Sequence, residues 1–152
     1  LKKESTYTTE NINIENIENF RSKELFSNEL IEFTSLFDQN EKFIILNIWA
    51  SWCLPCRSEH EFLMKLSQNS DIKIVGLNYK DNQENAKEFL KELGNPFEKI
   101  LIDRKGLIAI EIGAYGIPET YLIDNYDKKI IKKYIGPIDK IKMEKIISIL
   151  KL

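Results

Sequence analysis

A strand-length apolar segment runs directly into a pair of cysteines, and few folds accommodate that order. Residues 43–50 (Phe-Ile-Ile-Leu-Asn-Ile-Trp-Ala) are almost uninterrupted in their hydrophobicity, which is typical of a central strand covered on both faces. Cys53-Leu-Pro-Cys56 follows after two residues, and the apolar positions of residues 54–68 have helical spacing. The pattern therefore predicts a strand that leads into a helix at the cysteines, the first half of a β-α-β unit.

Strand and helix signals alternate along the rest of the chain. Strands are expected over 72–79, 100–103, 120–124 and 129–134, helices over 86–93, 107–112 and 143–150, and a short strand or hairpin with a helical turn within 14–40. This order predicts an α/β fold with a central mixed sheet and helices on both faces. A length of 152 residues suits one domain, which we expect over residues 14–152 after a flexible, polar lead-in over residues 1–13.

Composition excludes several classes of function. The net charge of −2 gives no overall positive field, so nucleic acid is not an expected partner. A lysine cluster alternates with isoleucines and is expected to form a solvated strand edge; it comprises Lys128, Lys129, Lys132 and Lys133. No apolar stretch approaches the roughly 20 residues of a membrane span. Because the chain begins at Leu1, an anchor or signal segment could have been removed.

Cys53 and Cys56 are the only cysteines. At a helix N-terminus, unpaired N–H groups and the helix dipole stabilise a thiolate, so Cys53 is predicted to be the attacking sulfur. Cys56, one turn further on, is more shielded and is predicted to resolve the mixed disulfide. Pro55 fits the first turn because it lacks an N–H, and it stiffens the pair.

Two other uses of the cysteines are weighed against redox chemistry. A permanent structural bridge would close so short a loop that it would add little stability. A metal site could recruit His60, one turn beyond Cys56, but a closed zinc site needs four ligands and no second cysteine pair exists. No metal is therefore predicted, and His60 is expected to be a surface residue.

A second motif, Gly-Ile-Pro-Glu-Thr over residues 116–120, precedes a predicted strand. A cis bond between Ile117 and Pro118 would present backbone hydrogen-bonding groups beside the cysteines. Such a proline is usually structural when it occurs alone. Together with a Cys-x-x-Cys motif after a buried strand, it favours a substrate-binding loop.

The segment from Trp49 to Arg57 resembles the active-site segment of the thioredoxin superfamily, and residues 117–120 resemble its cis-proline loop. Five ordered segments together are similar to the CcmG or DsbE type of cytochrome c biogenesis thiol:disulfide interchange protein, a TlpA-like group; they are residues 47–53, 56–60, 76–81, 91–97 and 115–124. The resemblance implies a thioredoxin-like fold with an N-terminal extension and an extra helical insert, which matches residues 82–95.

The resemblance also implies a function. Such a protein is a periplasmic reductant, usually held to the inner membrane by an N-terminal segment, which this chain does not contain. It takes electrons from a DsbD- or CcdA-like membrane donor and reduces apocytochrome c at its C-x-x-C-H site, or a CcmH-like partner. No cofactor beyond the redox-active disulfide is implied. A monomer is expected, because burial in a dimer would obstruct the dithiol.

The resemblance further implies acidic residues near the cysteines, and the matching positions here are Glu59 and Glu119. Trp52 flanks the cysteine pair. A buried carboxylate near Cys56 would raise the pKa of its thiol and could accept its proton. A solvated helix position remains the alternative for Glu59. An acidic site with no nearby cation predicts a poorly stabilised thiolate and a reducing potential.

Two alternatives remain open. One is a general TlpA- or ResA-like thiol reductase that serves other substrates. The other is a copper-binding chaperone that uses both cysteines and His60.

Overall fold

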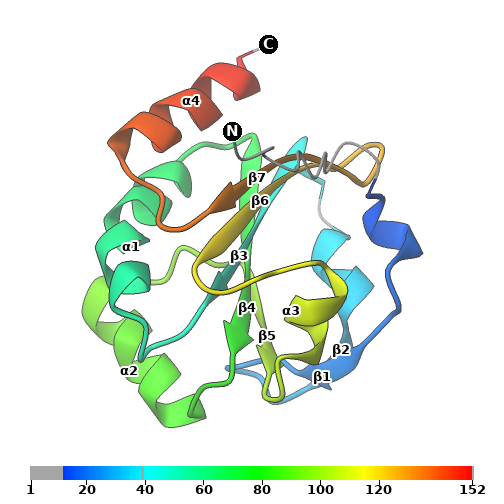
Figure 1. Ribbon diagram of the computed structural model, residues 1–152, viewed down its shortest axis with the longest axis vertical. Coiled ribbons are helices and arrows are strands. Elements are labelled where there is room, and N and C mark those ends of the chain that lie inside the picture. Colours follow the sequence, from blue (N-terminus) through cyan, green and yellow to red (C-terminus); the bar gives the residue numbers. More distant parts are fainter. Residues whose placement is uncertain (1–11, 39, 152) are drawn as a thin grey trace, which may run out of the picture.

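The structure is a computed structural model that describes residues 12–38 and 40–151. Five strands form one mixed sheet in the order β5-β4-β3-β6-β7 (Figure 1). The central strand β3 (Phe43–Trp49) is parallel to β4 (Ile72–Tyr79) and antiparallel to β6 (Glu119–Asp124). Outside them, β5 (Lys99–Asp103) is parallel to β4, and β7 (Lys129–Ile135) is antiparallel to β6. Every residue of β3 is buried, as its apolar sequence predicts.

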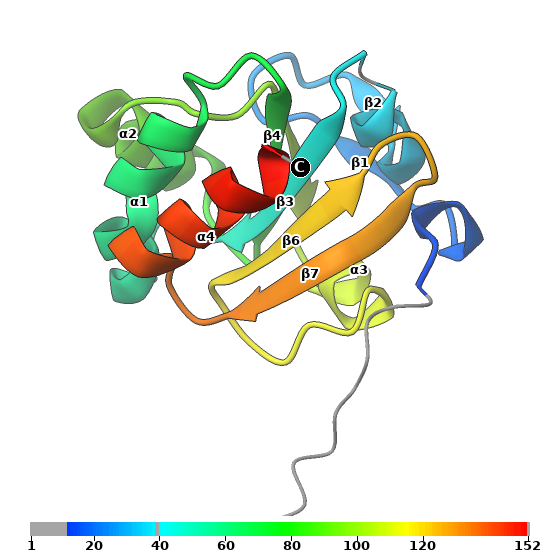
Figure 2. The same ribbon diagram turned by 90° about the horizontal axis from the view of Figure 1, so that it is seen from above.

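Helices cover both faces of the sheet (Figure 2). One face carries α1 (Leu54–Leu66), α2 (Gln83–Leu93) and α4 (Lys140–Leu150). The other carries α3 (Leu107–Glu111) and two 3₁₀ helices, η2 (Ile14–Asn16) and η3 (Phe33–Phe37). Each side has its own apolar cluster, because alternate residues of the strands point to opposite faces. The predicted α/β fold with a central mixed sheet is therefore confirmed.

The N-terminal extension contains the expected hairpin, formed by β1 (Arg21–Lys23) and β2 (Leu30–Glu32). It lies along β5, where the N–H of Leu25 donates to the carbonyl of Ile100 at 3.0 Å. The hairpin therefore covers one edge of the sheet, where unpaired strand groups would otherwise be open to association.

The predicted lead-in over residues 1–13 lies mostly outside the described residues, which begin at Ile12. Its last two residues are held against the other edge of the sheet. The carbonyl of Ile12 accepts a hydrogen bond from the N–H of Ile130 at 3.2 Å, and Asn13 forms a bridge with Lys129. Among the described residues, contacts with this edge of the sheet therefore begin at Ile12.

The predicted insert over residues 82–95 contains α2. The side chain of Asn82 caps its N-terminus by accepting from the N–H of Asn85, and Gly94, at φ 95°, ends it. Gln83 donates to the carbonyl of Leu25 at 2.9 Å, so the insert and the N-terminal hairpin support each other.

The lysine cluster is only partly a solvated edge. Lys129 and Lys132 are exposed as expected, but Lys128 and Lys133 are half-buried. The ammonium of Lys128 binds the carbonyl of Phe37 and the side chain of Asn125. The expectation was wrong for these two residues because their long side chains reach acceptors on neighbouring segments.

Candidate active site

Both cysteines lie where β3 ends and α1 begins, and they form a disulfide with their Cα atoms 5.3 Å apart. Cys53 is the N-cap of α1, and its sulfur accepts a hydrogen bond from the N–H of Cys56 at 3.2 Å. Pro55 lies in the first turn, as predicted. The sulfur of Cys53 is thus placed at the positive end of the helix dipole, where a thiolate is favoured.

Cys56 is the more shielded of the two cysteines, as its position one turn into the helix predicted. It is 1% exposed and Cys53 is 5% exposed, and both belong to the apolar cluster on the α1 side of the sheet. A partner can therefore reach Cys53 more easily than Cys56.

The loop before Cys53 is fastened to the turn that follows β4. The carboxylate of Asp81 accepts from both the N–H and the hydroxyl of Ser51, each at 2.7 Å. It also accepts from the side chain of Asn78 at 3.0 Å and from the N–H of Asn82 at 2.8 Å. The side chain of Asp81 therefore holds the active-site loop to the carboxyl end of the neighbouring strand.

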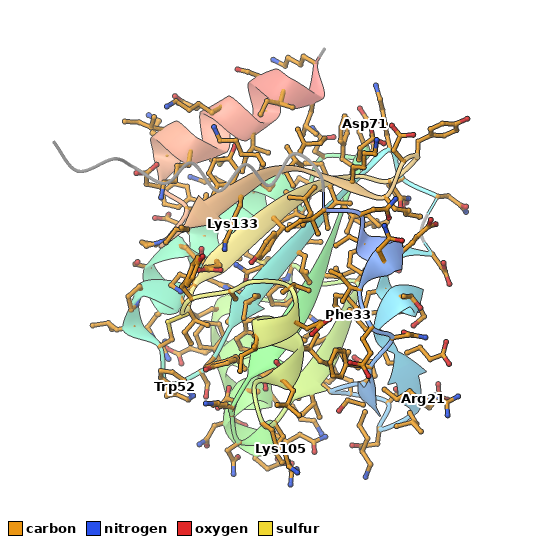
Figure 3. All side chains as sticks on the ribbon, turned by 45° about the vertical axis from the view of Figure 1, so that its right-hand side comes forward. Arg21, Phe33, Trp52, Asp71, Lys105 and Lys133 are labelled. Atoms are coloured by element: carbon orange, nitrogen blue, oxygen red, sulfur yellow. A yellow bond between two sulfur atoms is a disulfide. The ribbon has the colours of Figure 1, made fainter. Side chains whose placement is uncertain are left out.

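Trp52 remains 59% exposed beside the disulfide, yet its position is fixed. Its indole N–H donates to the carbonyl of Lys80 at 3.0 Å, and its ring lies 6.5 Å from that of Tyr79. Figure 3 shows Trp52 at the periphery of the molecule. An exposed aromatic surface held in one orientation beside a reactive sulfur suits contact with a partner.

His60 is buried, so the expected surface position was wrong. Its Nε2 lies 2.7 Å from the carbonyl of Gly94, and its ring packs edge-on against Phe89 and Phe97. Burial lowers the pKa of His60 below its usual value. The imidazole is committed to this contact.

Glu59 is also buried, which excludes the solvated alternative. It lies one turn beyond Cys56 on the same face of α1. Its Oε2 accepts from Nδ2 of Asn47 at 3.1 Å, and its Oε1 accepts from the N–H of Ile138 at 3.1 Å. Asn47 lies on β3 and also donates to the hydroxyl of Thr120 on β6, at 3.0 Å.

Desolvation raises the pKa of Glu59 from 4.5 to about 7, opposed by the hydrogen bonds from Ile138 and Asn47 and by the positive charge of Lys142. The carboxyl group can therefore gain or lose a proton near neutral pH. A group that titrates there, one helical turn from Cys56, is suited to exchange a proton with that thiol.

The Ile117–Pro118 bond is cis, as predicted from the Gly-Ile-Pro-Glu-Thr motif. Ile117 packs against the apolar cluster that contains both cysteines. The carbonyl of Pro118 accepts from the N–H of Gly136 at 3.0 Å, whereas no main-chain hydrogen bond between described residues involves Ile117. The backbone of Ile117 is thus available to an extended partner strand.

Glu119 does not lie on the face of the sheet that carries the disulfide. Along β6, Thr120 reaches toward Asn47 on the α1 side, whereas Tyr121 belongs to the cluster on the α3 side, and Glu119 shares the orientation of Tyr121. Its carboxylate accepts from the N–H of Tyr115 and from the hydroxyl of Tyr121, at 3.0 and 3.1 Å. Glu119 thus holds the loop that leads to the cis-proline.

Lys133 is the cation that the sequence reasoning missed at this loop. Its ammonium lies 3.4 Å from the carboxylate of Glu119 and donates to the carbonyl of Gly113 at 2.7 Å (Figure 3 labels Lys133). The ring of Tyr115 lies 4.6 Å from the same ammonium. The expectation of an acidic site without nearby cations was therefore wrong, because the charges are paired.

Asn47, Asp81 and Lys142 were also not predicted as site residues. Only Asn47 had a signal in the sequence, since a polar side chain within a fully buried strand must find partners. Asp81 and Lys142 are recognised as site residues only from their contacts in the folded chain, and the neighbouring sequence does not predict those contacts.

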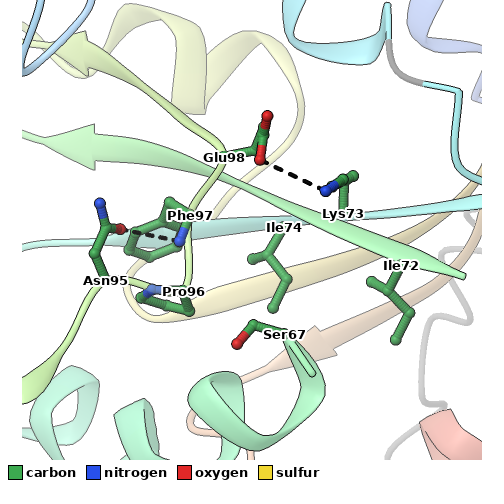
Figure 4. A pocket seen from close by; sticks show the side chains of 8 residues that line it. All are labelled: Ser67, Ile72, Lys73, Ile74, Asn95, Pro96, Phe97 and Glu98. Atoms are coloured by element: carbon green, nitrogen blue, oxygen red, sulfur yellow. Dashed lines mark hydrogen bonds and ion pairs between the residues drawn. The ribbon is translucent and has the colours of Figure 1, made fainter. Parts of the chain in front are cut away.

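A groove of about 260 Å³ beside Trp52 is lined by residues of α1 and α2, including Arg57, Glu88 and Glu92. A second pocket, of about 200 Å³, lies at the amino end of β4 and is lined by Ile72, Lys73 and Glu98 among others (Figure 4). That end of β4 is remote from the disulfide. Within residues 12–38 and 40–151, no three His, Cys, Asp or Glu side chains are grouped to hold a metal ion.

A redox-active cysteine pair at the start of the helix after the central strand, next to a cis-proline loop, defines the class of thioredoxin-like thiol:disulfide oxidoreductases. Comparison with known proteins agrees. The Redoxin family profile matches residues 17–147, and the chain belongs to this family.

Curated relatives are thiol:disulfide interchange proteins. CycY of Rhizobium leguminosarum bv. viciae is 48% identical over 103 residues, which cover 68% of this chain and 55% of the relative. DsbE of Haemophilus influenzae is 41% identical over 118 residues, 77% of this chain and 62% of the relative. The chain thus spans little more than half of the length of these proteins.

Solved structures share the fold. A putative thiol:disulfide interchange protein DsbE from Chlorobium tepidum has a TM-score of 0.69 at 23% identity and covers 88% of this chain and 92% of its own. StoA from Bacillus subtilis has a TM-score of 0.63 at 26% identity and covers 84% and 92%. The predicted thioredoxin-like fold is confirmed.

Proposed function

We propose that the protein reduces disulfides in cytochrome c maturation by dithiol–disulfide exchange. The observation that carries the proposal is the Cys53–Cys56 pair at the N-terminus of α1, with the buried Glu59 one turn beyond it. The names of the relatives support thiol:disulfide interchange. The cytochrome substrate rests on the sequence resemblance to the CcmG and DsbE type.

The exchange has two steps. The thiolate of Cys53 attacks one sulfur of the substrate disulfide, forms a mixed disulfide and releases the other substrate sulfur as a thiolate, which takes up a proton. Glu59 accepts the proton of Cys56, whose sulfur attacks that of Cys53. The second substrate thiol leaves with a proton, and the protein holds the Cys53–Cys56 disulfide after two electrons have passed to the substrate.

A reducing potential is favoured by the surroundings of Cys56. A buried carboxylate one helical turn from this sulfur disfavours its thiolate, and a dithiol whose thiolates are poorly stabilised is readily oxidised to the disulfide. The cation paired with Glu119, Lys133, does not alter this, because that carboxylate is on the other face of the sheet.

We also propose the partners and location that the resemblance implies. The substrate is apocytochrome c or a CcmH-like protein, and the electron donor is a DsbD- or CcdA-like membrane protein on the periplasmic side. The chemistry needs no cofactor beyond the disulfide. None of the described helices is long and apolar enough to cross a membrane.

The first experiment measures the midpoint potential of Cys53–Cys56 in defined thiol buffers, by tryptophan fluorescence. A value close to that of thioredoxin, roughly −270 mV, supports a reductant, and a value of about −120 mV contradicts it. A Cys56→Ser variant should then trap a disulfide-bonded C-x-x-C-H peptide, and Cys53→Ser is the control. Equal trapping of unrelated disulfide peptides would instead favour the general TlpA- or ResA-like reductase.

A further inference from the structure

The loop between β7 and α4 connects the two parts of the active site. At its start, the N–H of Gly136 donates to the carbonyl of Pro118 at 3.0 Å. Two residues later, the N–H of Ile138 donates to Oε1 of Glu59 at 3.1 Å, and Ile138 itself is buried. The position of this loop therefore determines whether a main-chain donor reaches the carboxylate of Glu59.

Lys142 of α4 reaches back over this loop. Its ammonium donates to the carbonyls of Pro137 and Ile135, at 3.0 and 3.3 Å. These carbonyls lie on either side of Gly136, which adopts a positive φ of 82°. The side chain thus joins the first turn of α4 to the segment that carries the Ile138 donor.

Helix stability does not explain a lysine at this position. Lys142 is three residues beyond the N-cap Asp139, near the positive end of the helix dipole, where a cation is unfavourable. The carbonyls of the loop provide the compensating contacts.

Among the described residues, the other groups that bond to Glu59 or lie one turn before it on α1 are uncharged. β3 contributes Asn47, β6 contributes Thr120 through Asn47, and α1 contributes Cys56, which is in the disulfide. Lys142 is the charged side chain that acts on Glu59, and its charge lowers the pKa of the carboxyl group, in opposition to desolvation.

We propose that Lys142 is a positioning residue for Glu59, because its ammonium fixes the β7–α4 loop so that the Ile138 N–H stabilises the ionised carboxylate and its charge adds to that effect. The inference rests on the proposed function, in which Glu59 accepts the proton of Cys56. It extends that function by making a residue of α4 set the pH at which Cys56 is deprotonated.

The test is a titration of Glu59 in the oxidised full chain, followed by ¹³C NMR of the glutamate carboxyl groups. In Lys142→Met the midpoint should rise by roughly one pH unit, since both the positive charge and the fixed donor are lost. Lys142→Arg should restore the midpoint. Lys145→Met, which alters an exposed lysine of the same helix, is the matched control and should leave it unchanged.

An unchanged Glu59 midpoint in folded Lys142→Met would overturn the proposal. If that variant does not fold, Lys142→Gln takes its place under the same criterion. A second measurement, the pH profile of Cys56 alkylation in a Cys53→Ser background, tests separately whether Glu59 accepts the proton of Cys56. A midpoint that rises without any change in this profile would support Lys142 as a positioning residue and contradict Glu59 as the proton acceptor.

Discussion

Asn47 of the central strand donates to Glu59 of the active-site helix at 3.1 Å inside the core. The same Nδ2 also donates to Thr120, whereas the Oδ1 of Asn47 has no partner among the described residues. An ionised Glu59 accepts from the amide as it stands. A protonated Glu59 would instead donate through its carboxyl O–H. If the side-chain amide of Asn47 were rotated by 180°, its Oδ1 could accept that hydrogen bond.

The first prediction concerns the pH dependence of stability. The pKa of Glu59 is raised from 4.5 to about 7 on folding, so between these values the folded protein binds more protons than the unfolded chain. Its contribution to stability is fully present below pH 4.5 and is lost as the pH rises through 7. The loss amounts to roughly 3 kcal/mol.

Glu59→Gln removes this titration. Urea unfolding of the oxidised proteins at pH 5 and pH 8 should show that the variant gains stability relative to the parent by roughly 2 to 3 kcal/mol at the higher pH. Glu61→Gln, which changes an exposed glutamate of the same helix, is the control. Parallel pH curves for the parent and Glu59→Gln would show that Glu59 does not titrate in this range.

A second prediction concerns the pair of Lys133 and Glu119 beneath the cis-proline loop. Lys133→Met leaves a buried carboxylate without its cation, and it should lower the free energy of unfolding by about 3 kcal/mol. Lys132→Met, at an exposed position, should change it by less than about 0.5 kcal/mol. Adding Glu119→Gln to Lys133→Met should recover part of the loss. A double variant no more stable than Lys133→Met alone would argue against the pairing.

The sequence was sufficient for the central strand and the start of α1. An apolar run such as residues 43–50 has few alternatives to a buried strand, and Cys53-Leu-Pro-Cys56 carries its own helix-start signals. The cis bond before Pro118 was also predicted, because the Gly-Ile-Pro-Glu-Thr motif and the cysteine pair together indicate a substrate-binding loop.

The burial and orientation of His60, Glu119 and Lys133 could not be predicted from local sequence patterns. His60 is buried because Gly94 and two aromatic rings reach it from distant segments. The orientation of Glu119 depends on the register of β6, in which residues on both faces are apolar, so alternation gives no answer. Polar residues whose partners are far along the chain look the same in sequence whether they are buried or exposed.

A third prediction addresses Asp81, which fastens the loop before Cys53. Asp81→Ala removes four hydrogen bonds to the carboxylate and should lower the free energy of unfolding by about 2 to 3 kcal/mol. Ser51→Ala removes only the hydroxyl bond and should cost about 1 kcal/mol. Urea unfolding compares the two variants, and near-UV circular dichroism reports on Trp52. Equal losses would mean that the hydroxyl accounts for the whole contact.

The last prediction concerns the packing of Trp49 behind the active site. Its ring stacks on that of Phe97 with centroids 5.4 Å apart, and both rings pass close to Gly76 on β4. A Cβ atom at Gly76 would lie 2.9 Å from the indole nitrogen of Trp49 and 3.1 Å from the ring of Phe97. Gly76→Ala should therefore displace the stacked rings and lower the free energy of unfolding by about 1 to 3 kcal/mol.

Gly116→Ala is the control for this substitution, since a Cβ atom there would meet no atom within 4 Å. Near-UV circular dichroism should change for Gly76→Ala and remain as in the parent for Gly116→Ala. If Gly76→Ala keeps the parent's stability and spectrum, the rings have room to move. Trp49 would then not be a rigid support for the loop that carries Cys53, and the fixed position of that loop would rest on its hydrogen bonds to Asp81 and to the carbonyl of Lys80.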